Sequence, residues 1–252
     1  MLKTDFHLHA HEDWYDHYHI TYTAKDLILL AEKKEFDVLA LTFHNRVYFP
    51  NSLRSYAKKH GILLIPGAEV RIHGKDVLLA NVTEKDILKL RDLEDLDKIK
   101  DHALITAPHP YFVLGPCLKG LLEKHIKRFH AIEFGHFYAK PVLSPFLRFI
   151  DGNRKAVKMA KKYKKPLLGT SDAHRKYDFG RTFSWVNADK DKDSILEAIK
   201  KRKVTVHSKP LPMHDFVRRA LSLIMRERII PYIKRIDNHM PDISEDPHYR
   251  RR

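Results

Sequence analysis

Thr4-Asp5-Phe6-His7-Leu8-His9 is the first apolar run of the chain, and it ends on two histidines that are one residue apart. In a β-strand, alternate side chains point to the same side, so His7 and His9 would lie together at the end of a strand. Two imidazoles in that arrangement can chelate one metal ion. The alternative is chance clustering, because the chain contains 18 histidines.

Short apolar runs of the same kind recur along the chain and alternate with helical patterns. The further runs are Val38–Thr42, Leu63–Val70, Leu104–Pro108, Ala131–Phe134, Pro166–Thr170 and Phe183–Val186. Amphipathic helical patterns cover Ala24–Lys34, with Thr23 as N-cap, and then Asn153–Tyr163 and Ser194–Lys201. Alternating strands and helices indicate an α/β fold with a parallel sheet. Seven runs favour a single TIM-like seven-stranded (β/α)7 barrel, whose sites form at the C-terminal ends of the strands.

Two segments depart from this alternation. Arg71–Val82 is predicted to be a hairpin that turns at His73-Gly74-Lys75. A basic amphipathic helix is predicted from Met213 to Ile236, followed by a polar tail over 241–252 that we expect to be mobile. We therefore expect residues 1–208 to form the barrel. Residues 209–252 would add a C-terminal basic helix and tail to the same domain.

Residues of the types that bind metal ions lie where four of the later apolar runs end. His44 follows the second run, Glu69 lies at the end of the third, His109 follows the fourth, and Asp172 and His174 follow the sixth. Carboxylates beside apolar strands are costly unless they are paired or bound to a metal. These positions together favour a metal site over chance clustering.

The set of motifs resembles the PHP family, named after polymerase and histidinol phosphatase. The chain contains DFHLH, LTFHN, PGAEV, APHP and GTSDAH, in the family's order, between Asp5 and about Val206. The resemblance implies a seven-stranded α/β barrel, two or three divalent metal ions of zinc, manganese or iron, and hydrolysis of phosphoesters. Glu69, His109, Asp172 and His174 would be the catalytic residues.

The resemblance also implies a ligand set. His7, His9, Glu69 and Asp172 would hold a first ion, and Glu69 and His109 a second. His44 and His174 would help to hold a third, with one more ligand from the loop Ala10–Tyr22. Counting back from the first helix favours His19 for that loop ligand, with His17 as the near alternative and His11 or Asp16 after it.

Two positions depart from the family pattern. Asp76 stands where the family often has a histidine, so Asp76 would be a ligand of the second ion. Its carboxylate is harder than imidazole and adds negative charge, which changes the metals that the site prefers. Phe43 stands where the motif usually has an aspartate that orients the neighbouring ligand, so we expect a looser third site.

Three further residues are candidates for substrate binding. A phosphate calls for cationic side chains near the rim of the site. Arg46 follows the His44 motif and Arg181 follows the stretch after His174, although either could be a surface ion-pair partner instead. His136, at the end of the fifth run, is a candidate for substrate contact, and a satisfied buried histidine is the alternative.

Composition narrows the class of protein. Cys117 is the only cysteine, which excludes a disulfide within the chain and favours a reducing cytoplasm. The sequence contains no membrane-spanning run and no signal-peptide core. The net charge is +15, and the basic excess lies after residue 100. That excess would attract a polyanion or form a solvated surface.

The leading hypothesis is therefore a cytoplasmic metal-dependent phosphoesterase. Its substrate would be a small phosphorylated metabolite or nucleotide, cleaved by a hydroxide that the ions activate near neutral pH. A nuclease acting on DNA or RNA is the second hypothesis, because the later half of the chain is basic. A barrel that serves only as a scaffold in an RNA–protein assembly is the third, and the ligand set argues against it. The oligomeric state stays open.

Overall fold

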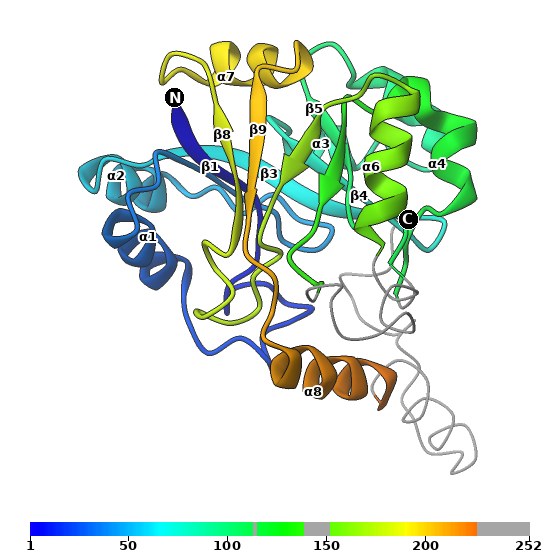
Figure 1. Ribbon diagram of the computed structural model, residues 1–252. Helices are drawn as coiled ribbons and strands as arrows, with labels where there is room; N and C mark the ends of the chain where they lie inside the picture. Colours follow the sequence, from blue (N-terminus) through cyan, green and yellow to red (C-terminus); the bar gives the residue numbers. More distant parts are fainter. Residues whose placement is uncertain (113–114, 139–151, 226–252) are drawn as a thin grey trace, which may run out of the picture. The chain divides into compact units, whose positions relative to one another are not determined.

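We describe a computed structural model of the protein, which covers residues 1–112, 115–138 and 152–225. Within these ranges, residues 1–211 and the residues from Pro212 onward form two compact units. The first unit holds a nine-stranded sheet and the helices around it (Figure 1). Its strands are β1 (Leu2–Leu8), β2 (Val38–Leu41), β3 (Leu63–Ile72), β4 (Lys75–Ala80), β5 (Leu104–Ala107), β6 (Ala131–Phe134), β7 (Leu167–Gly169), β8 (Thr182–Val186) and β9 (Val204–Ser208).

The sheet is mixed, with the strand order β7-β6-β5-β4-β3-β2-β1-β8-β9. Neighbours are parallel from β1 to β3 and from β5 to β7. β4 is antiparallel to both of its neighbours, and so is β8. All seven predicted runs are strands, but the expectation of a seven-stranded (β/α)7 barrel is wrong for the described residues. The last of those runs, β8, is reversed, and the hairpin and β9 add two strands.

The reversal of β4 has a local cause. The β3–β4 turn is tight, with His73 at φ 47° and Gly74 at φ 69°, as the predicted hairpin requires. Such a short turn joins only antiparallel strands. β9 was not among the predicted runs: its five residues are half-buried or exposed, and only Val204 and Val206 among them are apolar.

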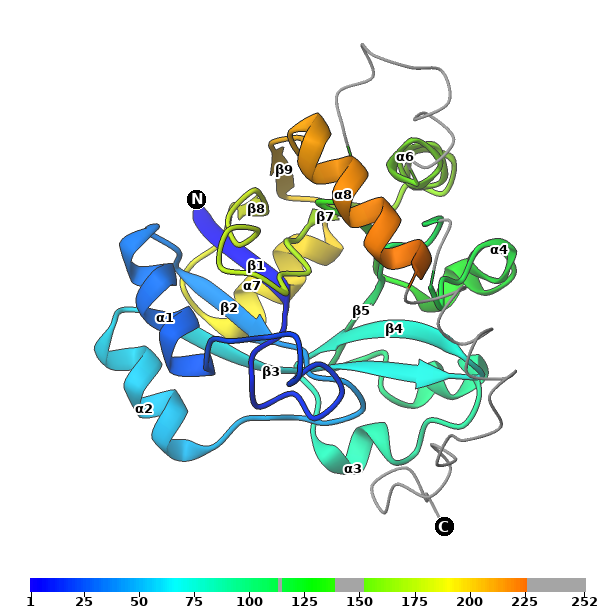
Figure 2. The same ribbon diagram turned by 90° about the horizontal axis from the view of Figure 1, so that it is seen from below.

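The ends of the sheet approach each other, so the sheet is nearly closed into a barrel (Figure 2). The backbone N–H of Gly169 in β7 donates to Ser184 Oγ in β8 at 2.8 Å, and Ser184 Oγ donates back to the Gly169 carbonyl at 3.0 Å. A Cβ atom on Gly169 would lie 2.7 Å from both the Phe183 carbonyl oxygen and Val206 Cγ1. Only glycine permits this contact between β7 and the β8–β9 pair.

Helices surround the barrel and close one of its ends. They are α1 (Ala24–Lys33), α2 (Asn51–Lys59), α3 (Glu84–Ile87), α4 (Gly120–His125), α6 (Asn153–Lys162) and α7 (Lys192–Lys200), with 3-10 turns η1 (Leu93–Lys98) and η2 (Ile126–Arg128). The predicted cap at Thr23 is confirmed, because its side chain accepts the Asp26 N–H and Asp26 returns the bond. In Figure 1, α1 and α2 flank one side of the sheet, and α4 and α6 the other.

One core cluster fills the end of the barrel where the parallel strands begin. It contains the first residues of those strands, such as Val38, Leu104 and Ala131. The last residue of the reversed strand β8, Val186, belongs to the same cluster. Ile195 and Ile199 of α7 pack into the same cluster. Because apolar side chains fill this end, the polar residues at strand ends gather at the other one.

The second unit is described only over its beginning. α8 runs from Met213 to Ile224, in agreement with the start of the predicted basic helix. The rest of that prediction, to Ile236, and the tail over 241–252 lie outside the described residues. No helix in the described part of the chain is long and apolar enough to cross a membrane.

Candidate metal centre

The candidate ligands lie where the parallel strands of the first unit end. His7 and His9 lie at the end of β1. His44 follows β2, and Glu69 lies within β3, where its backbone forms an isolated β-bridge with His44. His109 follows β5, and Asp172 and His174 follow β7. His109 and Asp172 have positive φ angles, of 27° and 43°, which are strained for residues with a side chain. The strand ends thus bring together the predicted residues of five motifs.

The first predicted ligand set forms one compact group. His7 Nε2 lies 3.3 Å from Glu69 Oε2 and 3.5 Å from Asp172 Oδ1. His9 Nε2 lies 3.5 Å and 3.6 Å from the same two atoms. A tetrahedral zinc site with bonds of about 2.0–2.1 Å separates its ligand atoms by roughly 3.3–3.4 Å. The spacing therefore fits a transition-metal ion.

The two histidine nitrogens of this group are the atoms that need a partner. Both Nε2 atoms are buried and have no hydrogen-bond partner within the described ranges. A buried nitrogen without a partner costs about 1–3 kcal/mol. A cation between these nitrogens and the two carboxylates would satisfy all four groups, so the residues fit a metal ion.

Glu69 extends the group toward a second set of residues. Its other oxygen, Oε1, lies 3.2 Å from His109 Nε2, and Asp76 lies close enough to share an ion with both. Burial and the charge of Glu69 raise the pKa of Asp76 to about 6, against the opposing effect of Arg71. Arg71 Nε donates to Asp76 Oδ1 at 2.8 Å. Asp76 is therefore where the sequence predicted it, but it has an arginine partner that the sequence analysis missed.

A third set of residues comes from the loop after β1. His174 Nε2 lies 3.0 Å from Asp16 Oδ2, and His44 Nδ1 lies 3.3 Å from the same atom. His19 belongs to none of the groups that could hold an ion, and it is exposed. The loop turns so that Asp16, one of the weaker alternatives, faces the cluster, and a ligand role for His19 stays a prediction. His17 Nδ1 instead donates to the Trp14 carbonyl at 2.6 Å.

Asp13 orients two of the ligands, and the sequence analysis missed it. Its Oδ2 atom accepts from His9 Nδ1 at 2.8 Å, from His44 Nδ1 at 3.0 Å and from the His44 N–H at 3.1 Å. These bonds leave the Nε2 atoms to face the cluster. The sequence feature that could have pointed to Asp13 was Phe43, because a motif without its usual aspartate needs an orienting carboxylate from elsewhere in the chain.

Glu133 in β6 does the same for the opposite side of the cluster. It is fully buried, and its Oε1 atom accepts from His7 Nδ1 at 2.7 Å and from the Thr170 hydroxyl. Its other oxygen accepts from the His109 backbone N–H. A carboxylate inside a buried strand was the available signal, since it must be paired there. Cys117 Sγ lies 3.5 Å from His109 Nδ1 and is a further contact that was not predicted.

The pKa shifts of the cluster indicate that a metal ion would bind in exchange for protons. Burial would lower the pKa of His7, but the surrounding carboxylates, Asp172 foremost, raise it well above its usual value. Burial would raise the pKa of Glu69, yet the neighbouring histidines, beginning with His7, lower it well below its usual range. Protonated imidazoles thus balance the carboxylates without an ion. An incoming cation must displace those protons, so its affinity should rise with pH.

The cluster is open on one side. The side chains of His109, Asp172 and His174 are 21%, 25% and 33% exposed, whereas those of His7 and His9 are fully buried. Solvent therefore reaches the cluster at these three residues.

The predicted substrate-binding residues are placed in different surroundings. Arg46 is exposed, with its guanidinium 5.3 Å from the ring centre of Tyr48. Arg181 donates to Tyr177 Oη at 3.0 Å and to the Pro210 carbonyl. His136 is buried at the end of β6. The role of all three in substrate binding stays a prediction.

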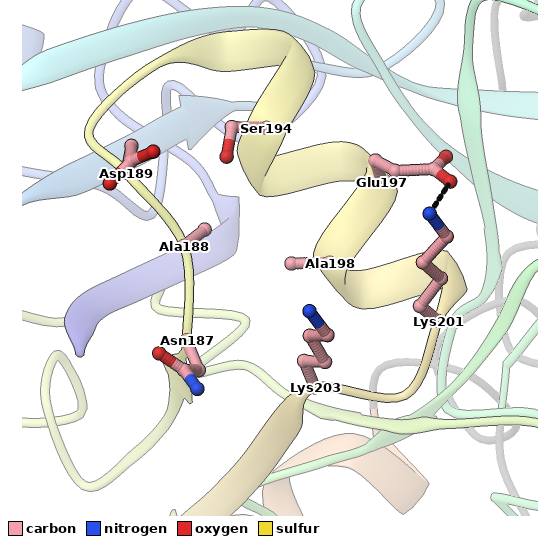
Figure 3. Close-up of a pocket in the computed structure, with 8 residues that line it drawn as sticks. All are labelled: Asn187, Ala188, Asp189, Ser194, Glu197, Ala198, Lys201 and Lys203. Atoms are coloured by element: carbon pink, nitrogen blue, oxygen red, sulfur yellow. Dashed lines mark ion pairs between the residues drawn. The ribbon is translucent and has the colours of Figure 1, made fainter.

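A separate cavity of about 370 Å³ lies between the β8–α7 loop and the start of β9 (Figure 3). Its lining mixes acidic and basic residues, and Glu197 and Lys201 form an ion pair across 2.8 Å. None of the predicted site residues lines it. We therefore place the functional site at the metal-ligand cluster.

Comparisons with known proteins agree with the fold and with the motif analysis. Residues 151–204 match a family model described as PHP-associated. An uncharacterized protein of Methanocaldococcus jannaschii is 27% identical over 101 residues, which are 40% of this chain. The matched part spans 57% of that relative's length.

Two solved structures resemble the chain. PsfC of Pseudomonas syringae has a TM-score of 0.56 and 15% identity, over 94% of this chain and 99% of PsfC, and this likeness concerns the fold alone. A candidate metal-dependent phosphoesterase of Bifidobacterium adolescentis has a TM-score of 0.43 and 14% identity, over 69% of this chain and 88% of that one.

Proposed function

We propose that the chain, whose residues 151–204 match a PHP-associated family model, is a metal-dependent phosphoesterase that acts on a small phosphorylated metabolite or nucleotide. One observation carries this proposal: His7 Nε2 and His9 Nε2 each lie 3.3–3.6 Å from a carboxylate oxygen of Glu69 and of Asp172, and neither buried nitrogen has a hydrogen-bond partner among the described residues. A site that served only for folding would pair these nitrogens within the protein.

The residues divide the work of such an enzyme between holding ions and orienting ligands. His7, His9, Glu69 and Asp172 would hold one ion, and Glu69 and His109 a second, with Glu69 offering one oxygen to each. Asp16 and His174 would hold a third, and His44, whose Nε2 atom lies 3.2 Å from Glu69 Oε2, would help to hold it. Bound divalent ions supply Lewis acidity, which lowers the pKa of water and offsets phosphate charge.

The chain's own groups prepare the site for this chemistry. Asp13 and Glu133 accept hydrogen bonds from the Nδ1–H groups of His9 and His7, so the Nε2 lone pairs point at the cluster. Burial of these ligands excludes bulk water, which strengthens every electrostatic contact. The substrate would enter past His109, Asp172 and His174, which therefore line its path.

Metal stripping and reloading tests the proposal. Protein reloaded with Mn²⁺, Zn²⁺ or Fe²⁺ should hydrolyse aryl phosphates or nucleotides, and stripped protein should not. His7→Ala should abolish the activity, whereas His60→Ala should keep it. His60 is a matched control, because its Nδ1 also contacts a carboxylate, Glu32, at 2.9 Å, but outside the cluster. A fully loaded protein that cleaves no phosphoester would refute the proposal.

A nuclease is the second candidate, and the outer face of α6 favours it. Arg154, Lys155, Lys158 and Lys161 are exposed there, and α6 contains no acidic residue. Contacts to a nucleic-acid backbone weaken strongly between about 50 and 200 mM salt. Polarisation of labelled DNA and RNA over that salt range tests this candidate. Binding that is absent at low salt would exclude it.

A further inference from the structure

Arg71 and Asp76 face each other across the β3–β4 hairpin, at the edge of the metal-ligand cluster. They are directly paired in the strand register. Arg71 Nε donates to Asp76 Oδ1 at 2.8 Å, and Arg71 Nη2 lies 3.4 Å from Asp76 Oδ2. Asp76 is only 3% exposed and belongs to the same group of ligand atoms as Glu69 and His109. The guanidinium therefore stands beside the second ligand set.

The guanidinium is held in place on a second side by the loop after β1. Its carbon lies 5.2 Å from the ring centre of Tyr15, and Nη1 donates to Tyr15 Oη at 3.3 Å. The Tyr15 ring lies 4.5 Å from the ring of His44. Contacts thus run from His44 through Tyr15 and Arg71 to Asp76, along the edge of the cluster. A cation fixed in this way loses little freedom when it binds a ligand.

Arg71 retains donors for a ligand. A guanidinium has five N–H groups, and Nε–H, one hydrogen of Nη1 and one of Nη2 are used in the contacts above. One N–H on each terminal nitrogen has no partner among the residues that the structure describes. The side chain is 23% exposed, so solvent reaches it. Two parallel N–H groups are the arrangement that binds two oxygens of a phosphate.

We infer that Arg71 binds the phosphate group of the substrate, and that Asp76 is the positioning carboxylate that aims it. This inference rests on the proposed phosphoesterase function and names a specificity residue for it. Arg46 and Arg181, the two arginines that the sequence favoured, have no comparable contact with the cluster. Arg71 keeps its charge at every pH at which the protein is folded, because guanidinium pKa values exceed about 12.

The test compares three variants of the full, manganese-loaded chain. Arg71→Ala removes the guanidinium, Arg71→Lys keeps the charge without the planar fork, and Arg54→Ala is the control. Arg54 also lies over an aromatic ring, 4.9 Å from the centre of Phe49, but on α2. The measurements are metal content by elemental analysis, KM and kcat for an aryl phosphate, and the dissociation constant of inorganic phosphate by calorimetry.

We expect Arg71→Ala to raise KM and the phosphate dissociation constant by about 10- to 100-fold, with unchanged metal content. Arg71→Lys should recover part of the loss, and Arg54→Ala should equal wild type. Unchanged phosphate affinity in Arg71→Ala would overturn the inference. So would loss of an ion from that variant, since Arg71 would then only support Asp76 as a ligand. If metal-loaded wild type neither binds phosphate nor cleaves phosphoesters, the proposed function fails first and the inference falls with it.

Discussion

Replacing Asp13 with asparagine should loosen two metal ligands at once. Asp13 Oδ2 accepts three hydrogen bonds, one from His9 and two from His44, and Asp13 Oδ1 accepts the Tyr15 N–H at 3.2 Å. An asparagine has only one oxygen to offer. In either orientation its NH₂ group faces a donor, so at least one bond becomes a repulsion.

The size of the effect follows from these contacts. Loss of an outer partner of a metal-bound histidine costs roughly 10- to 100-fold in metal affinity. Asp13 supports two histidines, and the remaining bonds would lose the charge of their acceptor. We therefore expect a loss of at least about 100-fold, or roughly 2.7 kcal/mol, for the ions that His9 and His44 hold. The variant should keep its fold, because the change is nearly isosteric.

Competition with a chromophoric chelator measures these affinities directly. Asp97→Asn is a suitable control, since that carboxylate contacts Arg128 at 3.0 Å and is 51% exposed. The control should bind Zn²⁺ and Mn²⁺ as wild type does. Wild-type affinity for every ion in Asp13→Asn would refute the reasoning, because it would show that the Nδ1 contacts do not orient the ligands.

Two further predictions concern charge. Glu69→Gln should reduce metal content and should lower turnover by at least about 100-fold, because a neutral amide cannot offset two cations. Elemental analysis and initial rates measure the two effects. A variant with wild-type values for both would show that Glu69 does not bridge two ions. His130→Asn should make the metal-free protein less sensitive to acid: burial foremost, then nearby lysines, lower the pKa of His130 to about 3 from 6.5. A histidine with a lowered pKa contributes stability above pH 6.5 that is lost as the pH falls toward 3, at up to about 1.4 kcal/mol per pH unit. Urea unfolding of both proteins between those pH values should give a shallower slope for His130→Asn, and equal slopes would contradict the shift.

The convergence of the candidate ligands could be predicted from the sequence because their positions are fixed by strand ends. His7, His9, His44, His109 and Asp172 each stand where an apolar run stops, and strand ends at one end of a barrel must converge. The sequence pattern of a strand does not show its direction in the sheet. β8 has the same pattern as a parallel strand, and only its pairing with β1 and β9 reveals the reversal.

The orienting residues were harder to predict, because they act across the fold. Asp13 and Asp16 lie in an irregular loop, where no periodicity fixes which side chain turns inward. Glu133 lies inside a strand that reads as apolar. Arg71 becomes relevant only once the hairpin places it opposite Asp76. Such pairings depend on register and loop conformation, which a single sequence does not determine.

If the cluster binds two ions, as we propose, the position of Glu133 predicts that they load cooperatively. Its two oxygens connect His7 to the backbone at His109 and to Thr170, three points on separate strand ends. An ion that immobilises His7 also immobilises Glu133, and through it the backbone that carries His109. The second ion then meets a ligand whose ordering entropy has already been lost, so its apparent affinity increases. By reciprocity, chelation of one ion should accelerate the departure of the other.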